Sequence, residues 1–233
     1  VGEQQVQDCA EQLIRAVFKE TLEVDLPDPF PRMSWRDAME RYGSDKPDLR
    51  ISSELVAVDE HVRHVEFKVF SAPAQAEGSR VAALKVAGGA ELSRKQIDDY
   101  TLFAGRHGAK GLAWIKVNDV AAGLAGLQSP IVKFLDDKAW QGIANATGVA
   151  SGDLLFFGAG EWLPVSNFMG QLRVRIAHDI GQVAQGWQPL WVTAFPMFEW
   201  DEASGRFMAM HHPFTAPLAP GAVYQLKIDY HGT

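Results

Sequence analysis

The stretch VAALKVAGGAELSRKQID, residues 81–98, decides the fold class of this chain. Its first six residues are apolar apart from Lys85, which is typical of a strand inside a sheet. Two glycines then favour a turn, and Ser93 with Gln96 three residues later forms the capping box that begins a helix. The helix carries one apolar stripe, formed by Ile97, Tyr100, Phe103 and Ala104. A strand, a turn and an amphipathic helix in direct succession predict a mixed α and β domain.

The same mixture continues on both sides of this stretch. Further strands are predicted at Val65–Phe70, Leu112–Val117 and Asp153–Phe157, and a second amphipathic helix at Ser166–Ile180. The composition and the periodicity of the sequence change near Glu54 and again near Gly186. Residues 55–186 are therefore predicted to be a self-contained α+β unit.

Two flanks enclose this unit, residues 1–54 and 187–233. In the first flank, apolar residues recur at helical spacing from Val6 to Phe18, and three prolines between residues 25 and 31 end that helix. Ser34 is a good N-cap for a short helix that ends at Tyr42. In the second flank, residues 190–200 and 207–214 are strand candidates, joined by a hairpin loop at residues 201–205. The flanks are expected to form one discontinuous domain.

Composition excludes several classes of protein. The net charge is −7, with 22% charged and 47% hydrophobic residues, so any contact with nucleic acid must be local or be made mostly by other parts of the protein. The sequence contains no apolar run long enough to predict a membrane span, and its first residues show no secretory signal. The single cysteine, Cys9, excludes an internal disulfide and a cysteine-rich metal site. We expect Cys9 to be a small buried thiol on a helix face, in a cytoplasmic protein.

Motifs for the common cofactor and hydrolase sites are missing. The sequence has no GxGxxG after a strand, no GxxxxGK[ST] and no GxSxG. One helix and its end carry basic residues, which we interpret as a solvated helix face: Arg94, Lys95, Arg106, His107 and Lys110.

A set of short stretches nevertheless occurs in a recognisable order. They are RYGSDKPDLR at residues 41–50, FPMFE at 195–199 and HHPFTAP at 211–217, with the stretch 81–98, GAKGLAW at 108–114, SPIVKFL at 129–135 and DLLFFG at 153–158 between them. Together they resemble bacterial-type aspartyl-tRNA synthetase, a class II enzyme, from about residue 1 to residue 217. The middle resembles the GAD domain of that family. The resemblance implies a GAD-type α/β insertion flanked by parts of a class II antiparallel β-sheet domain.

The resemblance also implies a function. The parent protein would be an aspartate-tRNA ligase that uses ATP and magnesium and acts on tRNA and L-aspartate. It would form a homodimer and would have no membrane partner. The family's arginine-bearing and glycine-rich nucleotide regions would lie before Val1 and after Pro217, and none is recognisable here. We therefore expect this segment alone to bind no cofactor and to be inactive. A free-standing GAD-like module that binds tRNA or a protein partner is the alternative.

His211 is the candidate binding residue. Alternation along a strand would send His211 and His212 to opposite faces, which disfavours a shared metal ion. On the residues alone, a structural histidine pair is the simpler interpretation. In the resembled family, the first histidine of this motif contacts the bound aspartate, which would make His211 an N–H donor to a carboxylate.

Three further features stay open at the sequence level. In the 41–50 stretch, the charged residues could position a nucleotide or the acceptor end of tRNA, or could pair among themselves: Asp45, Lys46, Asp48 and Arg50. Glu199 has the same two readings at the end of the FPMFE strand. The family commonly has an acid directly before Phe-Pro-Met, where this chain has Ala194.

Overall fold

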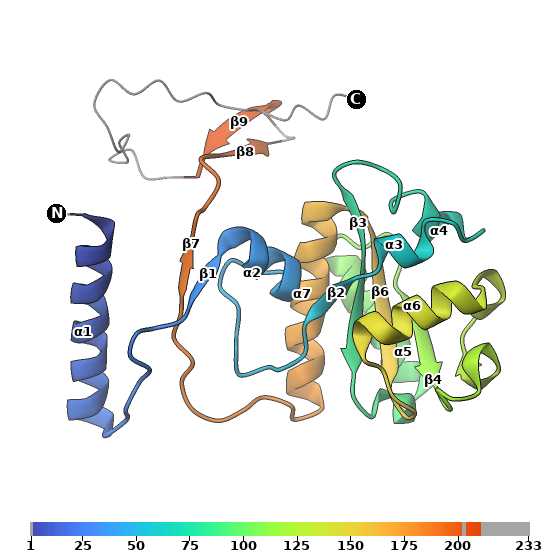
Figure 1. Cartoon of the computed structure of the whole chain (residues 1–233), viewed down its shortest axis with the longest axis horizontal. Helices are drawn as coiled ribbons and strands as arrows, with labels where there is room; N and C mark the ends of the chain where they lie inside the picture. The colour runs from blue at the N-terminus through green and yellow to red at the C-terminus, as the bar shows by residue number, and fades with distance from the viewer. Residues whose placement is uncertain (1, 202–203, 211–233) are drawn as a thin grey trace.

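The computed structural model describes residues 2–201 and 204–210 of the chain. Its centre is a five-stranded sheet in the order β2-β3-β6-β4-β5, antiparallel throughout (Figure 1). The strands are β2 (Leu55–Ala57), β3 (Ser79–Val86), β4 (Ala113–Val117), β5 (Leu127–Gln128) and β6 (Leu154–Glu161). The strands predicted around residues 80–86, 112–117 and 153–157 are confirmed.

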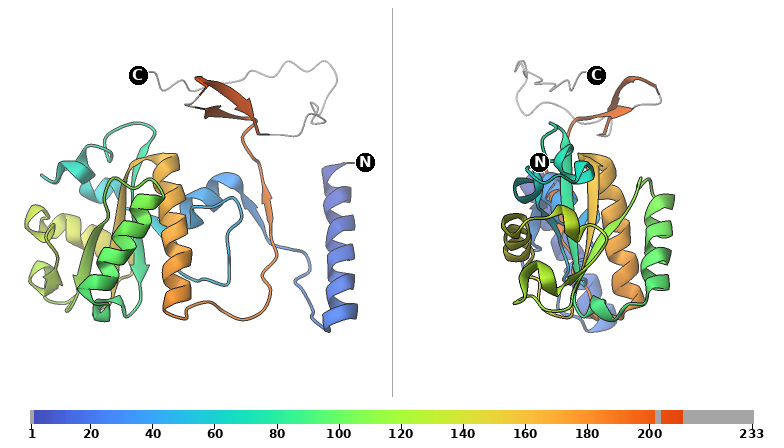
Figure 2. Two further views of the ribbon diagram at one scale, coloured as in Figure 1. Left: turned by 180° about the vertical axis from the view of Figure 1, so that it is seen from behind. Right: turned by 90° about the vertical axis from the view of Figure 1, so that its right-hand side faces the viewer.

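Helices cover both faces of this sheet, which explains why its central strands are apolar without alternation. On β3, Val81 and Ala83 belong to one core cluster, whereas Ala82 and Leu84 belong to the other. The second cluster lies under α5 (Arg94–Arg106) and α7 (Trp162–Asp179), and the first under α6 (Asp137–Thr147) and two short helices. Figure 2 shows α5 and α7 on one side of the strands and α6 on the other. The domain is thus an α+β sandwich of three layers.

The helix ends follow local chemistry. Ser93 caps α5 by accepting a hydrogen bond from the Gln96 backbone N–H, and the predicted capping box is present. Helix α7 begins directly after β6, four residues before the predicted start at Ser166. Helix α6 was not predicted. Its signal is nevertheless in the sequence, because the Asp136 carboxylate accepts the Ala139 N–H at 2.7 Å as an N-cap.

The strand predicted at Val65–Phe70 is wrong. That region follows α3 (Asp59–Val62) and consists of a bend and the first residues of α4 (Lys68–Ser71). The rings of Phe67 and Phe70 pack against each other, with centroids 5.0 Å apart, and Phe70 also packs on Phe157 at 5.3 Å. A helical turn puts residues three apart on the same side, whereas a strand would send Phe67 and Phe70 to opposite faces. The remaining short elements are the 3₁₀ turns η1 (Gly89–Glu91), η2 (Gly123–Gly126) and η3 (Val132–Phe134).

The two flanks lie side by side. Strand β1 (Arg32–Ser34) pairs in parallel with β7 (Trp191–Thr193), and β1 runs directly into α2 (Trp35–Tyr42), which packs against α7 (Figure 1). Ser34 caps α2 as predicted, with its hydroxyl 3.0 Å from the Asp37 N–H. The described pairing between the flanks is parallel, although an antiparallel sheet was expected for this domain.

Helix α1 (Glu3–Leu22) is attached through its polar side. Its buried residues are Gln7 and Glu11, whereas Leu13 on the apolar stripe is 64% exposed. The Glu11 carboxylate binds the Trp191 indole N–H at 2.7 Å and the Arg32 guanidinium at 3.1 Å. Cys9 is exposed, so its predicted burial is wrong. The physical reason is this carboxylate, which turns the opposite face of α1 toward the body.

A hairpin of β8 (Phe198–Asp201) and β9 (Arg206–Ala209) follows β7. The single strand predicted over residues 190–200 is interrupted, because Ala194 adopts a left-handed φ of 53° after β7. A hairpin is confirmed here, because Asp201 pairs with Arg206 and the Gly205 N–H donates to the Asp201 carbonyl at 2.8 Å. The strand predicted over residues 207–214 begins as β9, and its last part lies outside the described residues.

Candidate functional site

The histidine motif lies beyond the described chain. His211 and His212 are outside the described residues, so the role expected for His211 stays a prediction. Just before them, the Met210 N–H donates to the Met197 carbonyl at 3.0 Å, which joins the end of the hairpin to the Phe-Pro-Met stretch. Glu199 is exposed on β8, opposite Met208.

In the loop after α2, the charged residues pair among themselves, as one of the two interpretations expected. Lys46 lies 3.0 Å from the Asp45 carboxylate, and Arg50 lies 2.7 Å from Asp48. The hydrogen bond from Arg50 lowers the pKa of the Asp48 carboxyl, and the same bond raises the pKa of Arg50. Each of these four charged side chains thus has a partner within the loop.

A buried arginine from α7 holds the backbone of that loop through hydrogen bonds. The Arg173 guanidinium is 1% exposed and donates to three backbone carbonyls, those of Ser53 at 2.6 Å, Ile51 at 2.7 Å and Asp48 at 2.9 Å. It also lies over the Tyr42 ring, 4.9 Å from the centroid. Sequence reasoning missed this residue. The sequence feature that could have identified it is an arginine within the apolar stripe of α7, directly after Leu172.

Next to Arg173, a second set of hydrogen bonds closes the loop. The Glu54 carboxylate accepts from Arg41 at 2.6 Å and from the Tyr42 hydroxyl at 3.0 Å. The hydrogen bond from Arg41 is the main cause that lowers the pKa of Glu54. Burial is the main cause that raises the pKa of Tyr42. Glu54 is therefore ionised and acts as a structural acceptor at the entry to the five-stranded sheet.

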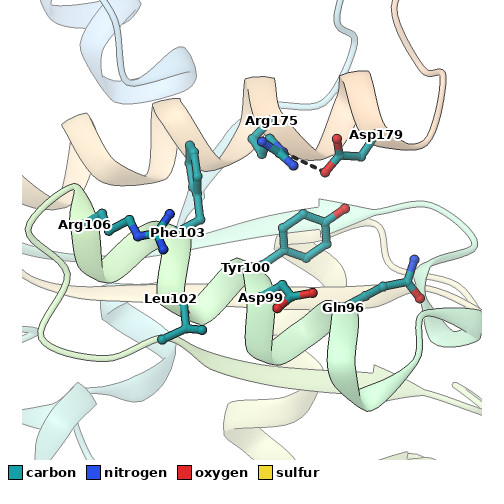
Figure 3. Close-up of a pocket in the computed structure, with 8 residues that line it drawn as sticks. All are labelled: Gln96, Asp99, Tyr100, Leu102, Phe103, Arg106, Arg175 and Asp179. Carbon is teal, nitrogen blue, oxygen red and sulfur yellow. Dashed lines mark hydrogen bonds and ion pairs between the residues drawn. The ribbon is translucent and has the colours of Figure 1, made fainter.

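A groove of about 480 Å³ runs between α5 and α7 (Figure 3). In it, Arg175 pairs with Asp179 at 2.8 Å and lies over the Phe103 ring at 5.8 Å. The pKa of Tyr100 is raised to about 12, first by burial and then by the charge of Asp179 and a hydrogen bond to it. The lining is Gln96, Asp99, Tyr100, Leu102, Phe103, Arg106, Arg175 and Asp179. Two cations and two acids balance, so the groove favours no single ligand charge.

The basic residues around α5 do not form one patch. Arg94 pairs with Asp98 at 2.9 Å near the start of the helix, whereas His107 stacks on Phe103 at its end, with ring centroids 4.3 Å apart. All five basic side chains are exposed, as the solvated-face interpretation expected.

Two kinds of feature are absent from the described part of the chain. Residues 2–201 and 204–210 contain no group of three or more histidine, cysteine or acidic side chains that could hold a metal ion. None of the helices described there is long and apolar enough to cross a membrane.

Comparisons with known proteins show which proteins this chain is similar to. Residues 70–169, from α4 to the middle of α7, match the profile of the GAD domain family. The chain is 55% identical over 217 residues to the aspartate–tRNA ligase of Xanthomonas campestris pv. campestris strain B100, and 54% identical to those of Xanthomonas oryzae pv. oryzae strain MAFF 311018 and Stenotrophomonas maltophilia strain K279a.

The chain is homologous to a GAD-containing segment of bacterial aspartate–tRNA ligase. The match covers 93% of this chain and 36% of each of these ligases, so the chain spans about a third of their length. The resemblance seen in the sequence is thereby confirmed. Within the GAD match lie β3 to β6, α5, α6 and the first part of α7, whereas Arg173 lies four residues beyond its end.

Proposed function

We propose that this chain is the GAD-containing part of an aspartate–tRNA ligase, which joins L-aspartate to tRNA with ATP. The observation that carries the proposal is the 55% identity over 93% of the chain, because a match of that length extends beyond the GAD match into both flanks. We assign residues 1–54 and 187–233 to the catalytic domain of the parent enzyme and residues 55–186 to its insertion.

In this proposal His211 contacts the bound aspartate. An imidazole N–H can donate to the substrate carboxylate, and a hydrogen bond to a charged group typically contributes about 1.5–3 kcal/mol. The resembled chemistry is attack of the aspartate carboxylate on the α-phosphorus of ATP, which breaks the bond to the β-phosphate and releases pyrophosphate; positioning and charge stabilisation lower the barrier. His211 would position the nucleophile.

The described residues supply no cluster for magnesium. No step is therefore assigned to a metal ion held by them, and the groups that grip ATP and magnesium are expected elsewhere in the parent enzyme. By the same resemblance, the parent would be a cytoplasmic homodimer, and this segment alone would be inactive.

A chimeric enzyme tests the proposal. The segment of the Xanthomonas campestris ligase that aligns with this chain would be replaced by the 217 aligned residues. We expect the chimera to charge tRNA with aspartate. A chimera that folds, yet does not charge tRNA under conditions where the parent ligase does, would contradict the proposed function. A ligase whose insertion alone is replaced serves as the control, because it separates failure of the flanks from failure of the GAD region.

A further inference from the structure

Two arginines of the sandwich are buried and form no salt bridge with the described carboxylates, although acidic residues lie near both. Arg80 on β3 is 4% exposed and Arg173 on α7 is 1% exposed. Exposed arginines of the described chain, such as Arg41 and Arg175, pair with carboxylates instead. Burial lowers the pKa of both buried guanidinium groups. A buried charge is costly unless hydrogen bonds compensate it, so the partners of these two groups matter.

Both arginines donate to the same upstream segment. Arg80 donates to the Glu40 carbonyl at 3.1 Å and to the Ser166 hydroxyl at 2.9 Å. Glu40 lies in the last turn of α2, where carbonyl groups lack a partner within the helix. The three carbonyls that Arg173 binds lie a few residues further along, between Asp48 and Ser53. Four backbone carbonyls between residues 40 and 53 are thus held from β3 and α7.

The backbones of α2 and α7 touch between these two arginines. A β-carbon on Gly170 would overlap the backbone of Gly43, and one on Gly43 would overlap that of Ser166. Gly43 also has φ 65° as the C-cap of α2, which favours glycine. The exit from the sandwich is tied to the same loop, because the Ala184 N–H donates to the Arg50 carbonyl at 2.9 Å.

We propose that Arg80 and Arg173 are positioning residues that set the orientation of the flanks relative to the sandwich. The path is short. Residue Trp35 of α2 follows Ser34 of β1 directly, β1 pairs with β7, and α1 is held to β7 through Glu11. Contacts that fix the position of α2 therefore also fix the positions of β1, β7 and α1. Apolar contacts alone are non-directional, whereas a planar guanidinium that binds several carbonyls permits one geometry.

The inference goes beyond the proposed function, and its test needs no ligase activity. Cys9, the single cysteine of the chain, is exposed on α1 and provides one label site on a flank. Asn118→Cys, in an exposed loop after β4, provides the second on the sandwich. Spin labels at both sites would report the distribution of distances between flank and sandwich by double electron–electron resonance.

We expect a narrow distribution in the parent protein and broader ones in Arg80→Met and Arg173→Met, broadest when both are combined. In Arg173→Met, amide hydrogen exchange at Ile51 and Ala184 should be about tenfold to a hundredfold faster, as expected for loss of a hydrogen bond to a charged group. Arg175→Met is the matched control, because Arg175 lies on the same helix but is exposed, and its partners, Asp179 and the Phe103 ring, both lie within the sandwich. It should leave distances and exchange unchanged.

Exchange at β3 and β6 separates positioning from folding. These amides should stay protected in Arg173→Lys, which keeps the charge but lacks the planar fork, while its distance distribution broadens. An unchanged distribution in the double methionine variant with β3 and β6 still protected would overturn the inference. Loss of that protection in Arg173→Lys would overturn it as well, because Arg173 would then stabilise the core of the sandwich instead of placing the flanks.

Discussion

Replacing Glu11 by alanine should detach α1 from the rest of the molecule. The Glu11 carboxylate is 4% exposed and accepts from three donors: the Trp191 indole N–H at 2.7 Å, the Phe30 backbone N–H at 3.1 Å and Arg32 at 3.1 Å. Alanine leaves the two neutral donors unpaired, and each buried unpaired donor costs about 1–3 kcal/mol. Arg32 is partly exposed and can turn to water, so we add little for it.

These contributions sum to a loss of about 2–6 kcal/mol in the free energy that holds α1 in place. The measurement is hydrogen exchange along residues 3–22, supported by urea unfolding. Exchange there should approach that of a free helix, while β3 and β6 stay protected. Most of the stability of a helix in a protein comes from its tertiary contacts, so the detached segment should also lose helical circular dichroism.

Leu13→Ala on the same helix is the decisive comparison. Because Leu13 is 64% exposed, its truncation should change stability by less than about 0.5 kcal/mol. If Leu13→Ala proves more destabilising than Glu11→Ala, then α1 packs through its apolar stripe, and the attachment through Glu11 is refuted. Glu20→Ala, on an exposed part of the helix, controls for loss of a charge alone.

The other predictions concern activity and pH. The isolated chain should show no aspartate-dependent pyrophosphate exchange, and exchange above a no-enzyme control in a preparation cleared of host synthetase would contradict this. In a full-length ligase, His211→Ala should lower the specificity constant for aspartate about tenfold to a hundredfold and leave ATP binding nearly intact, with His212→Ala as the control. The pKa of Tyr100 is raised in the folded state, which therefore favours the neutral phenol. The contribution of Tyr100 to the free energy of unfolding is complete below its ordinary pKa of 10.0 and is lost as the pH rises toward about 12. Urea unfolding should therefore lose stability over that range more steeply in the parent than in Tyr100→Phe, and equal slopes would refute the assigned environment.

Local chemistry made much of the sandwich predictable. The capping box at Ser93 needs only residues three apart, and the strand that precedes it is apolar because both of its faces are covered. The relationship to aspartate–tRNA ligase was also visible, since it rests on the order of short stretches. The expected role of His211 came from that relationship alone.

Tertiary contacts decided the rest. The periodicity of α1 predicted a helix, but one buried carboxylate chose the side by which it attaches, and this left Cys9 exposed. Alternation suggested a strand at residues 65–70, but the packing of Phe67 and Phe70 with distant rings selected a helical turn. The sequence by itself thus determined the elements whose hydrogen bonds and apolar faces are local. It could not determine the partners of Arg173, because the carbonyls that accept its hydrogen bonds lie more than a hundred residues away and carry no side-chain signature.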